Sequence, residues 1–119
     1  MALKIKRAYE PASASDGTRY LVDRKWPRGV TREELRISAW LKEIAPSDDL
    51  RTWFGHDPAK YPEFRKRYIQ ELTTHRKLME SLVAEARDGT VTLIFGAKDV
   101  EHCNARVLRE ILSRMRRSL

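Results

Sequence analysis

A short apolar run that ends in a charged, proline-containing turn constrains this chain more than any other feature. Tyr20, Leu21 and Val22 form the run, and the residues that follow are Asp-Arg-Lys-Trp-Pro-Arg-Gly. Pro27 has no backbone N–H to donate to a sheet, so a strand over residues 19–25 ends at or before Trp26. Open α/β sheets bind ligands just beyond the carboxyl ends of their strands. The turn is therefore a candidate ligand site.

Two further segments have the character of strands. Residues 90–95 read Thr-Val-Thr-Leu-Ile-Phe, a pattern typical of a strand that is buried on both faces. Residues 3–8 alternate as an edge strand with one basic face does. The strands at 19–25 and 90–95 are separated by helical periodicity, and such a crossover joins parallel strands. We predict an α/β fold, a small three-layer α/β/α sandwich with a short, mostly parallel sheet of three strands.

Signals for helix starts and stops predict four helices, at residues 32–45, 48–54, 58–88 and 105–115. The first opens with a capping box of Thr31 and Glu34. The third begins after Asp57 and carries one apolar stripe as far as Gly89. The last is amphipathic. Helices are therefore expected on both faces of the sheet.

Length, charge and cysteine content narrow the class of protein. The 119 residues suffice for one domain, residues 1–119, with a substantial core. The net charge of +7 favours an anionic partner, which is nucleic acid, an anionic lipid surface or a small anion. A lone cysteine excludes an internal disulfide, and no apolar run reaches about 18 residues. We expect a cytoplasmic protein without a membrane span.

The carboxyl ends of parallel strands meet at one edge of a sheet, so the residues after 19–25 and 90–95 should lie close together. The predicted ligand-binding residues are Asp23, Arg24, Trp26, Arg28, Lys98, Asp99 and His102. Arginine forks and a lysine suit a carboxylate or a phosphate, which predicts a small anionic ligand. The alternative for Arg24 is a structural ion pair with Asp23 or Asp99, and the two roles do not exclude each other.

Other chemistries stay open at the same edge. Asp23 or Asp99 with His102 or His56 would suit acid–base catalysis. No nucleophile elbow, phosphate loop or Cys-x-x-Cys motif accompanies them, so we assign no catalytic residue and no cofactor. The histidines lack the spacing of a sharp metal motif, and no metal site is predicted. Cys103 is interpreted as a small core thiol.

The three tryptophans divide into two kinds. Trp40 and Trp53 have core spacing on their predicted helices, so both should be mostly buried. Trp26 follows a strand end, where its ring could stack on a ligand. Trp26 is therefore the tryptophan that we keep as a candidate ligand contact.

Residues 21–29, Leu-Val-Asp-Arg-Lys-Trp-Pro-Arg-Gly, resemble the signature LVDRLWPRG of the bacterial YeaO-like family, part of the group called domain of unknown function 488. The resemblance also covers residues 15–17, 40–47, 50–57, 64–68, 92–93, 97–99, 102 and 104–105. It implies a small α/β/α fold and no particular activity. Lys25 replaces a usual leucine, which predicts a side chain at solvent or at the edge of the site. Cys103 and Asn104 interrupt a usual Asn-His-Ala, so no role of a second histidine carries over.

Two functions fit these observations. The first is a pocket for a small anion at the carboxyl edge of the strands, with catalysis left open. The second is a basic nucleic-acid-binding module, which rests mainly on the net charge, because the sequence lacks a helix-turn-helix and a recognisable RNA-binding motif. We favour the first.

Overall fold

A parallel sheet organises the part of the chain that the computed structural model describes, residues 2–118. Within these residues the sheet has four strands in the order β1-β4-β2-β3, all parallel. The strands are β1 (Ala2–Arg7), β2 (Thr18–Leu21), β3 (Ala39–Trp40) and β4 (Thr90–Phe95). The inner strand β4 is buried on both faces, as parallel strands usually are. The predicted α/β class and parallel sheet are confirmed, β1 is an edge strand as expected, and β3 is additional.

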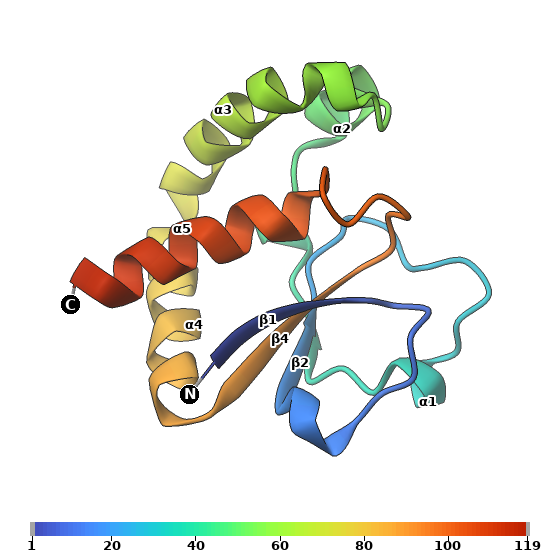
Figure 1. The fold of residues 1–119 in the computed structure, drawn as a ribbon, viewed down its shortest axis with the longest axis vertical. Coiled ribbons are helices and arrows are strands. Elements are labelled where there is room, and N and C mark those ends of the chain that lie inside the picture. The colour runs from blue at the N-terminus through green and yellow to red at the C-terminus, as the bar shows by residue number, and fades with distance from the viewer. Residues whose placement is uncertain (1, 119) are drawn as a thin grey trace.

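Helices flank the sheet on both faces (Figure 1). They are α1 (Arg32–Leu35), α2 (Asp48–Phe54), α3 (Tyr61–Leu72), α4 (Arg76–Asp88) and α5 (Asn104–Ser118), with 3₁₀ turns η1 (Ala14–Asp16), η2 (Lys42–Ile44), η3 (Pro58–Lys60) and η4 (Thr73–His75). Apolar residues of α3, α4 and α5 pack on one face, and Leu35 of α1 packs on the other. Within residues 2–118 no helix is both long enough and apolar enough to cross a membrane.

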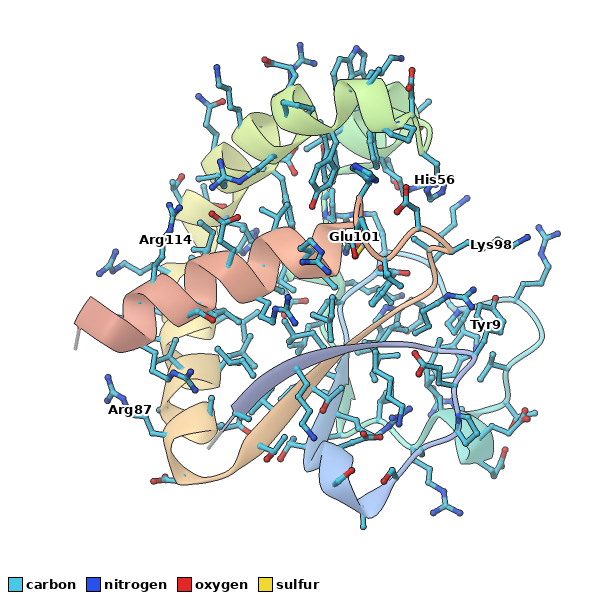
Figure 2. The ribbon with its side chains drawn as sticks, viewed as in Figure 1. Tyr9, His56, Arg87, Lys98, Glu101 and Arg114 are labelled. Carbon is cyan, nitrogen blue, oxygen red and sulfur yellow. The ribbon has the colours of Figure 1, made fainter. Side chains whose placement is uncertain are left out.

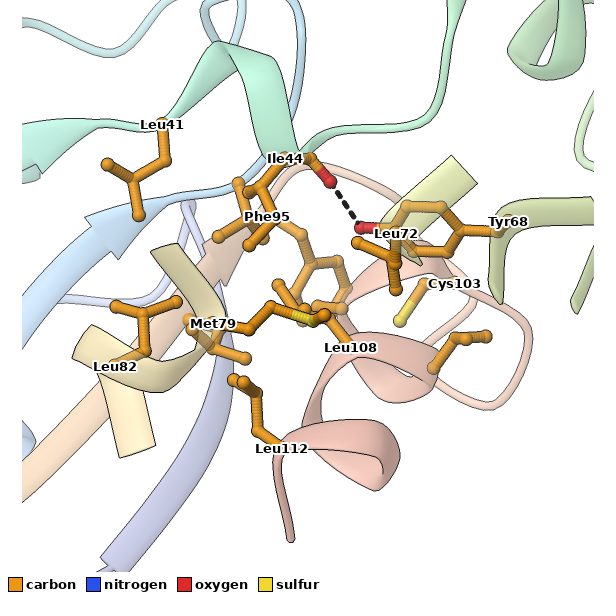
Figure 3. Packing of buried hydrophobic residues seen from close by; sticks show 14 of the residues in the cluster. Leu41, Ile44, Tyr68, Leu72, Met79, Leu82, Phe95, Cys103, Leu108 and Leu112 are labelled. Carbon is orange, nitrogen blue, oxygen red and sulfur yellow. Dashed lines mark hydrogen bonds between the residues drawn. The ribbon is translucent and has the colours of Figure 1, made fainter. Parts of the chain in front are cut away.

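The main core lies between the sheet and the three long helices (Figure 3). Val91, Leu93 and Phe95 of β4 point into it, because alternate residues of a strand share a face. Tyr68 of α3 is fully buried there, and its hydroxyl donates a 2.7 Å hydrogen bond to the Ile44 carbonyl. A buried tyrosine hydroxyl needs such an acceptor, so this bond fixes α3 against η2.

The opposite face combines a small apolar cluster with buried charge. Leu21 and Ile94 pack there, and Asp16 and Arg19 are each 4% exposed beside them. Arg19 donates to the Asp16 carboxylate at 2.6 Å, and Lys6 donates to it at 3.1 Å. Burial alone would raise the pKa of Asp16, but these bonds and one from the Ser13 backbone outweigh it and lower that pKa. The buried carboxylate thus joins η1 to β1 and β2.

The helix predicted at residues 32–45 is wrong beyond its first turn. The capping box of Thr31 is present, but α1 ends at Leu35 because Arg36 is left-handed, with a φ of 49°. The chain then forms β3, where Ser38 N–H donates to the Arg19 carbonyl and Leu41 N–H to the Leu21 carbonyl. This pairing gives the backbone groups on the outer edge of β2 hydrogen-bond partners in β3. The local sequence cannot predict these hydrogen bonds, because they form only in the tertiary structure.

The long helix predicted at residues 58–88 is also interrupted. It is divided into α3 and α4 by η4, and the two axes meet at an angle (Figure 1). The hydroxyls of Thr73 and Thr74 donate to the carbonyls of Gln70 and Glu71, at 2.6 and 2.9 Å. Such back-bonding competes with the regular helical pattern and bends helices. The apolar side chains of both α3 and α4 pack on the main core, so their spacing along the sequence matches that of one continuous helix.

Trp40 and Trp53 are mostly buried, as predicted, but Trp26 is in the same class of exposure, so burial does not separate the three tryptophans. Trp40 lies on the edge strand β3, with the Lys42 ammonium 4.0 Å from its ring centre. Trp53 lies on α2 between Lys60 and Arg67, at 5.1 and 4.3 Å. Long cationic side chains lie against these rings, which also pack against the apolar clusters on the two faces of the sheet.

Substituting Gly17→Ala should destabilise the protein strongly. Gly17 has a φ of 64°, and an added Cβ would overlap the backbone carbonyl of Thr90. Backbone strain and steric overlap together should lower the free energy of unfolding by about 2–6 kcal/mol, measured by urea denaturation.

The matched control is Gly29→Ala, because Gly29 also has a positive φ, 79°, but an added Cβ there would meet nothing within 4 Å. Only the backbone term of about 1–3 kcal/mol applies to it. Equal losses in the two variants would contradict the proposed packing of η1 against β4.

Candidate functional site

The carboxyl ends of β2 and β4 meet at one edge of the sheet, and Asp23 joins them. Gly96 N–H, just after β4, donates to Asp23 Oδ2 at 2.8 Å. The side-chain amide of Asn104, at the start of α5, donates to Asp23 Oδ1 at 3.2 Å and to the Val22 carbonyl at 3.0 Å. The Asp23 carboxylate therefore holds two strand ends and a helix start in fixed positions.

Burial dominates the electrostatics of Asp23. It raises the pKa of the carboxyl group, while the bonds from Gly96 and Asn104 and the charges of His56 and Arg51 lower it, and the net shift is upward. The Asp23 carboxylate makes few hydrogen bonds to solvent, since both of its oxygens accept from protein donors. Asp23 acts first as a structural tie.

A cavity of about 580 Å³ opens beside this tie. Its walls come from the turn after β2, the end of α2, the loop after β4 and the start of α5. They comprise Asp23, Arg24, Lys25, Trp26, Pro27, Pro46, Arg51, Phe54, His56, Phe64, Gly96, Ala97, Lys98, Asp99, His102, Cys103 and Asn104. His56 and Lys98 lie on separate loops at the same end of the molecule (Figure 2).

Positive charge outweighs negative charge in this lining. Four cations, Arg24, Lys25, Arg51 and Lys98, stand against the two carboxylates of Asp23 and Asp99. The side chains of Lys25 and Lys98 are exposed, as predicted for Lys25. An anion entering the cavity would therefore meet a net positive wall.

The two arginines of the lining differ in how far they are paired. Arg24 donates to the carbonyls of Pro46 and Ala45, at 3.0 and 3.2 Å, and lies 4.0 Å from Asp48. Arg51 Nη2 contacts Asp48 at 3.4 Å, but its Nε is buried with no hydrogen-bond acceptor among the described residues. The Arg51 side chain as a whole is 41% exposed, so its guanidinium is less fully engaged by the protein than that of Arg24.

Asp99 and His102 form a pair in the loop before α5. His102 Nδ1 lies 2.8 Å from Asp99 Oδ2, and this bond lowers the pKa of Asp99. An ionised carboxylate only accepts, so Nδ1 carries the proton. The imidazole also packs edge-on against the Tyr61 ring, with centroids 5.1 Å apart. The orientation of His102 is thus set from two sides, as that of a binding or acid–base histidine would need to be.

Aromatic side chains form much of the remaining wall. Phe54 and Phe64 stack with centroids 4.3 Å apart and are 5% and 2% exposed, so they make an apolar floor. Trp26 is half-buried, and its indole N–H donates to the Val30 carbonyl at 2.7 Å. Its ring meets Trp40 edge-on, at 5.4 Å. Apolar walls with few polar groups are typical of small-molecule sites.

The structure brings together most of the residues that the sequence suggested. Asp23, Arg24, Trp26, Lys98, Asp99 and His102 all line the cavity. Arg28 does not: its side chain is exposed, and its carbonyl accepts a 3.0 Å bond from the Tyr9 hydroxyl. The suggested ion pairs of Arg24 with Asp23 or Asp99 do not form, because backbone carbonyls at the end of η2 bind its guanidinium.

Sequence reasoning missed several lining residues. They are Arg51 and Phe54 of α2 and Phe64 of α3. Both helices reach this edge of the sheet. No local pattern reports that placement. The sequence pointed to Asn104 only weakly, because this residue belongs to a segment that resembles the YeaO-like family. Nothing in the sequence predicted that its amide donates to the Asp23 carboxylate.

Cys103 and the histidines give no sign of a second chemical centre. The Cys103 thiol is 1% exposed, and burial raises its pKa, which fits the predicted core thiol. Among residues 2–118 no three or more His, Cys, Asp or Glu side chains are grouped to hold a metal ion.

Comparison with known proteins shows close relatives along the whole chain. The model of the inactive DUF488-N3 subclade matches residues 2–118. Uncharacterized protein YeaO of Escherichia coli is 40% identical over 112 residues, which are 94% of this chain and 97% of that protein. Uncharacterized proteins Rv3073c of Mycobacterium tuberculosis and Mb3100c of Mycobacterium bovis are each 36% identical over 93% of both chains. No solved structure matches. The resemblance to the YeaO-like family is confirmed.

The raised pKa of Asp23 predicts a pH-dependent effect of Asp23→Asn. The wild-type carboxyl binds its proton more tightly when folded, so folding stability falls as pH rises from about 3.8 through the folded pKa. Asparagine keeps an acceptor for Gly96 and does not ionise. The free energy of unfolding of the variant, relative to wild type, should therefore be highest at neutral pH and decline toward pH 4.

Urea denaturation at several pH values between 4 and 7 measures this difference. Asp49→Asn, at an exposed aspartate on α2 outside the cavity, controls for the loss of one charge. A difference between wild type and Asp23→Asn that does not change with pH would contradict the buried, ionisable tie.

Proposed function

The chain belongs to the inactive DUF488-N3 subclade, and from that premise we propose that it is a binding protein that holds a small anionic ligand in the cavity at the carboxyl edge of β2 and β4. The site residues we propose are Arg51 and Lys98 as ligand contacts, with Arg24, Lys25 and His102 beside them. Asp23 and Asp99 position these groups.

The observation that carries the proposal is the excess of cations in the cavity lining, where Arg51 is the less fully paired of the two arginines. Arg51 lines the cavity with Lys98 and two further cations, and its guanidinium contacts Asp48 at 3.4 Å. An anion in the cavity would give the exposed part of this guanidinium a further charge-assisted partner. Arginine is suited to carboxylate and phosphate because its donors lie in one plane.

The start of α5 adds to the same field. Asn104 begins this 15-residue helix and lines the cavity. The amino end of a helix carries partial positive charge, which favours an anion. The cavity thus offers positive charge from side chains and from a helix end together.

The carboxylates of the lining oppose an anion less than their number suggests. Asp23 already accepts from Gly96 and Asn104, and Asp99 is paired with His102. Each negative charge is therefore partly offset by donors of the protein. Their role in the proposal is to fix the strand ends and the imidazole.

Two observations favour binding over catalysis. The subclade to which the chain belongs is described as inactive. Cys103, the thiol beside the Asp99–His102 pair, is buried with a raised pKa, which is the opposite of what a nucleophilic cysteine needs. The Asp99–His102 pair then serves to orient a hydrogen-bonding histidine.

We expect Arg51→Gln and Lys98→Gln to weaken anion binding. Inorganic phosphate, nucleotides and short DNA or RNA should be titrated by calorimetry at several salt concentrations. Loss of a charge-assisted hydrogen bond should reduce affinity by roughly 10- to 100-fold for Arg51→Gln, and less for the exposed Lys98. Arg28→Gln, an exposed cation outside the lining, is the matched control and should bind as wild type does.

Salt dependence separates this function from nucleic-acid binding. A pocket that contacts few charges should show a shallow dependence. Polynucleotide bound across a basic surface would lose roughly 10³–10⁵ in affinity between about 50 and 200 mM salt for six to ten phosphate contacts. A steep slope that is indifferent to Arg51→Gln, or binding that depends on Arg28 alone, would refute the pocket.

A further inference from the structure

We propose that the ligand of this cavity is an organic anion with a flat aromatic ring, which packs against Trp26 while its charged group binds near Arg51 and Lys98. This inference rests on the proposed function and deepens it by naming the class of ligand. It is carried by the size of the cavity, by the unequal chemistry of its walls and by the way Trp26 is held.

The cavity is too large for an inorganic anion alone. Its volume of about 580 Å³ lies within the range of roughly 300–1,000 Å³ that encloses drug-sized organic ligands. A phosphate or acetate ion would satisfy Arg51 and leave most of the apolar wall in contact with water. A ligand that fills the space must therefore carry an apolar part as well as a charge.

Charged and apolar residues occupy different parts of the cavity wall, as a ligand with a charged part and an apolar part requires. Exposed cations, Lys25 and Lys98, stand at the open side, whereas the stacked rings of Phe54 and Phe64 are almost fully buried. Removing apolar ligand surface from water against that floor is favourable, and the cations hold the charged group near solvent. This arrangement suits an amphiphilic molecule more than a highly polar one.

Trp26 is the wall residue best placed to recognise a ring. Its N–H is already used by the Val30 carbonyl, so the indole offers a ligand only its π surface, and the Arg32 guanidinium lies 6.0 Å from the ring centre. The edge-on contact with Trp40 and the bond to Val30 hold it in place, and it stays partly exposed. A preorganised aromatic surface loses little conformational freedom when it binds. Stacking on such a surface typically strengthens binding by roughly tenfold or more.

A cation lies near each tryptophan ring, but only Trp26 lines the cavity. Trp53 lies outside the lining, and Lys60 and Arg67 already flank its ring. Trp40 also lies outside the lining, with its N–H donated to the Asp23 carbonyl and Lys42 over its ring. Trp53 therefore provides a matched control for substitutions at Trp26.

The test compares anions that differ only in their apolar part. Benzoate and 1-naphthoate should bind at least about tenfold more tightly than acetate and cyclohexanecarboxylate, measured by calorimetry. Neutral benzamide should bind more weakly than benzoate, and Arg51→Gln should abolish most of that difference. Benzoate should also change the tryptophan fluorescence.

Variants locate the ring. Trp26→Leu should weaken 1-naphthoate binding by roughly tenfold and remove the fluorescence change, whereas Trp26→Phe, which keeps a ring, should retain most of the affinity. Trp53→Leu should bind as wild type does. Circular dichroism verifies that each variant is folded, and the Trp26→Phe variant keeps the test valid if Trp26→Leu fails to fold.

The outcomes separate this inference from the proposed function. If acetate or cyclohexanecarboxylate binds as tightly as benzoate, or if both Trp26 variants bind 1-naphthoate as wild type does, the aromatic class is overturned while anion binding stands. If no anion binds, inorganic phosphate included, the proposed function fails and this inference fails with it.

Discussion

The structure depends on one buried carboxylate at the edge of the sheet. Asp23 accepts from Gly96 and from Asn104, so a single side chain sets the spacing of β2, β4 and α5. Burial makes its charge unfavourable, as its raised pKa shows, yet removing either donor would leave a buried oxygen unpaired. Such a tie fixes geometry more than it adds stability. The cavity exists because the elements around it are held at these distances.

A second buried aspartate performs the same task on the opposite face of the sheet. Asp16 joins η1 to β1 and β2 through Lys6 and Arg19, but there cations surround the carboxylate and lower its pKa. The contrast shows two ways of stabilising a buried charge. Asp16 is paired directly with the cations Lys6 and Arg19. Asp23 relies on neutral donors, which leaves the nearby cations Arg51 and Lys98 available to a ligand.

Local signals predicted the elements well where side chains act within one turn or one strand. The caps at Thr31, Ser47 and Asp57 and the left-handed Gly55 lie where the sequence places them. The errors arose where distant backbone decided the outcome. β3 forms because β2 lacks a partner on its outer edge, and the bend at η4 arises where threonine hydroxyls take helical carbonyls. The spacing of apolar residues along the sequence does not reveal either effect, since the apolar side chains stay on the core in both cases.

The sequence by itself determined the α/β class, the parallel crossover between β2 and β4, and the meeting of Asp23 and Trp26 with Lys98, Asp99 and His102 at one edge. These follow from strand patterns and from the rule that parallel strands end together. Only the tertiary structure decided which cations face the cavity, because the packing of α2 and α3 brings in Arg51 and leaves Arg28 outside. It alone decided this because the direction of a side chain after a turn depends on contacts between distant segments, which no local spacing encodes.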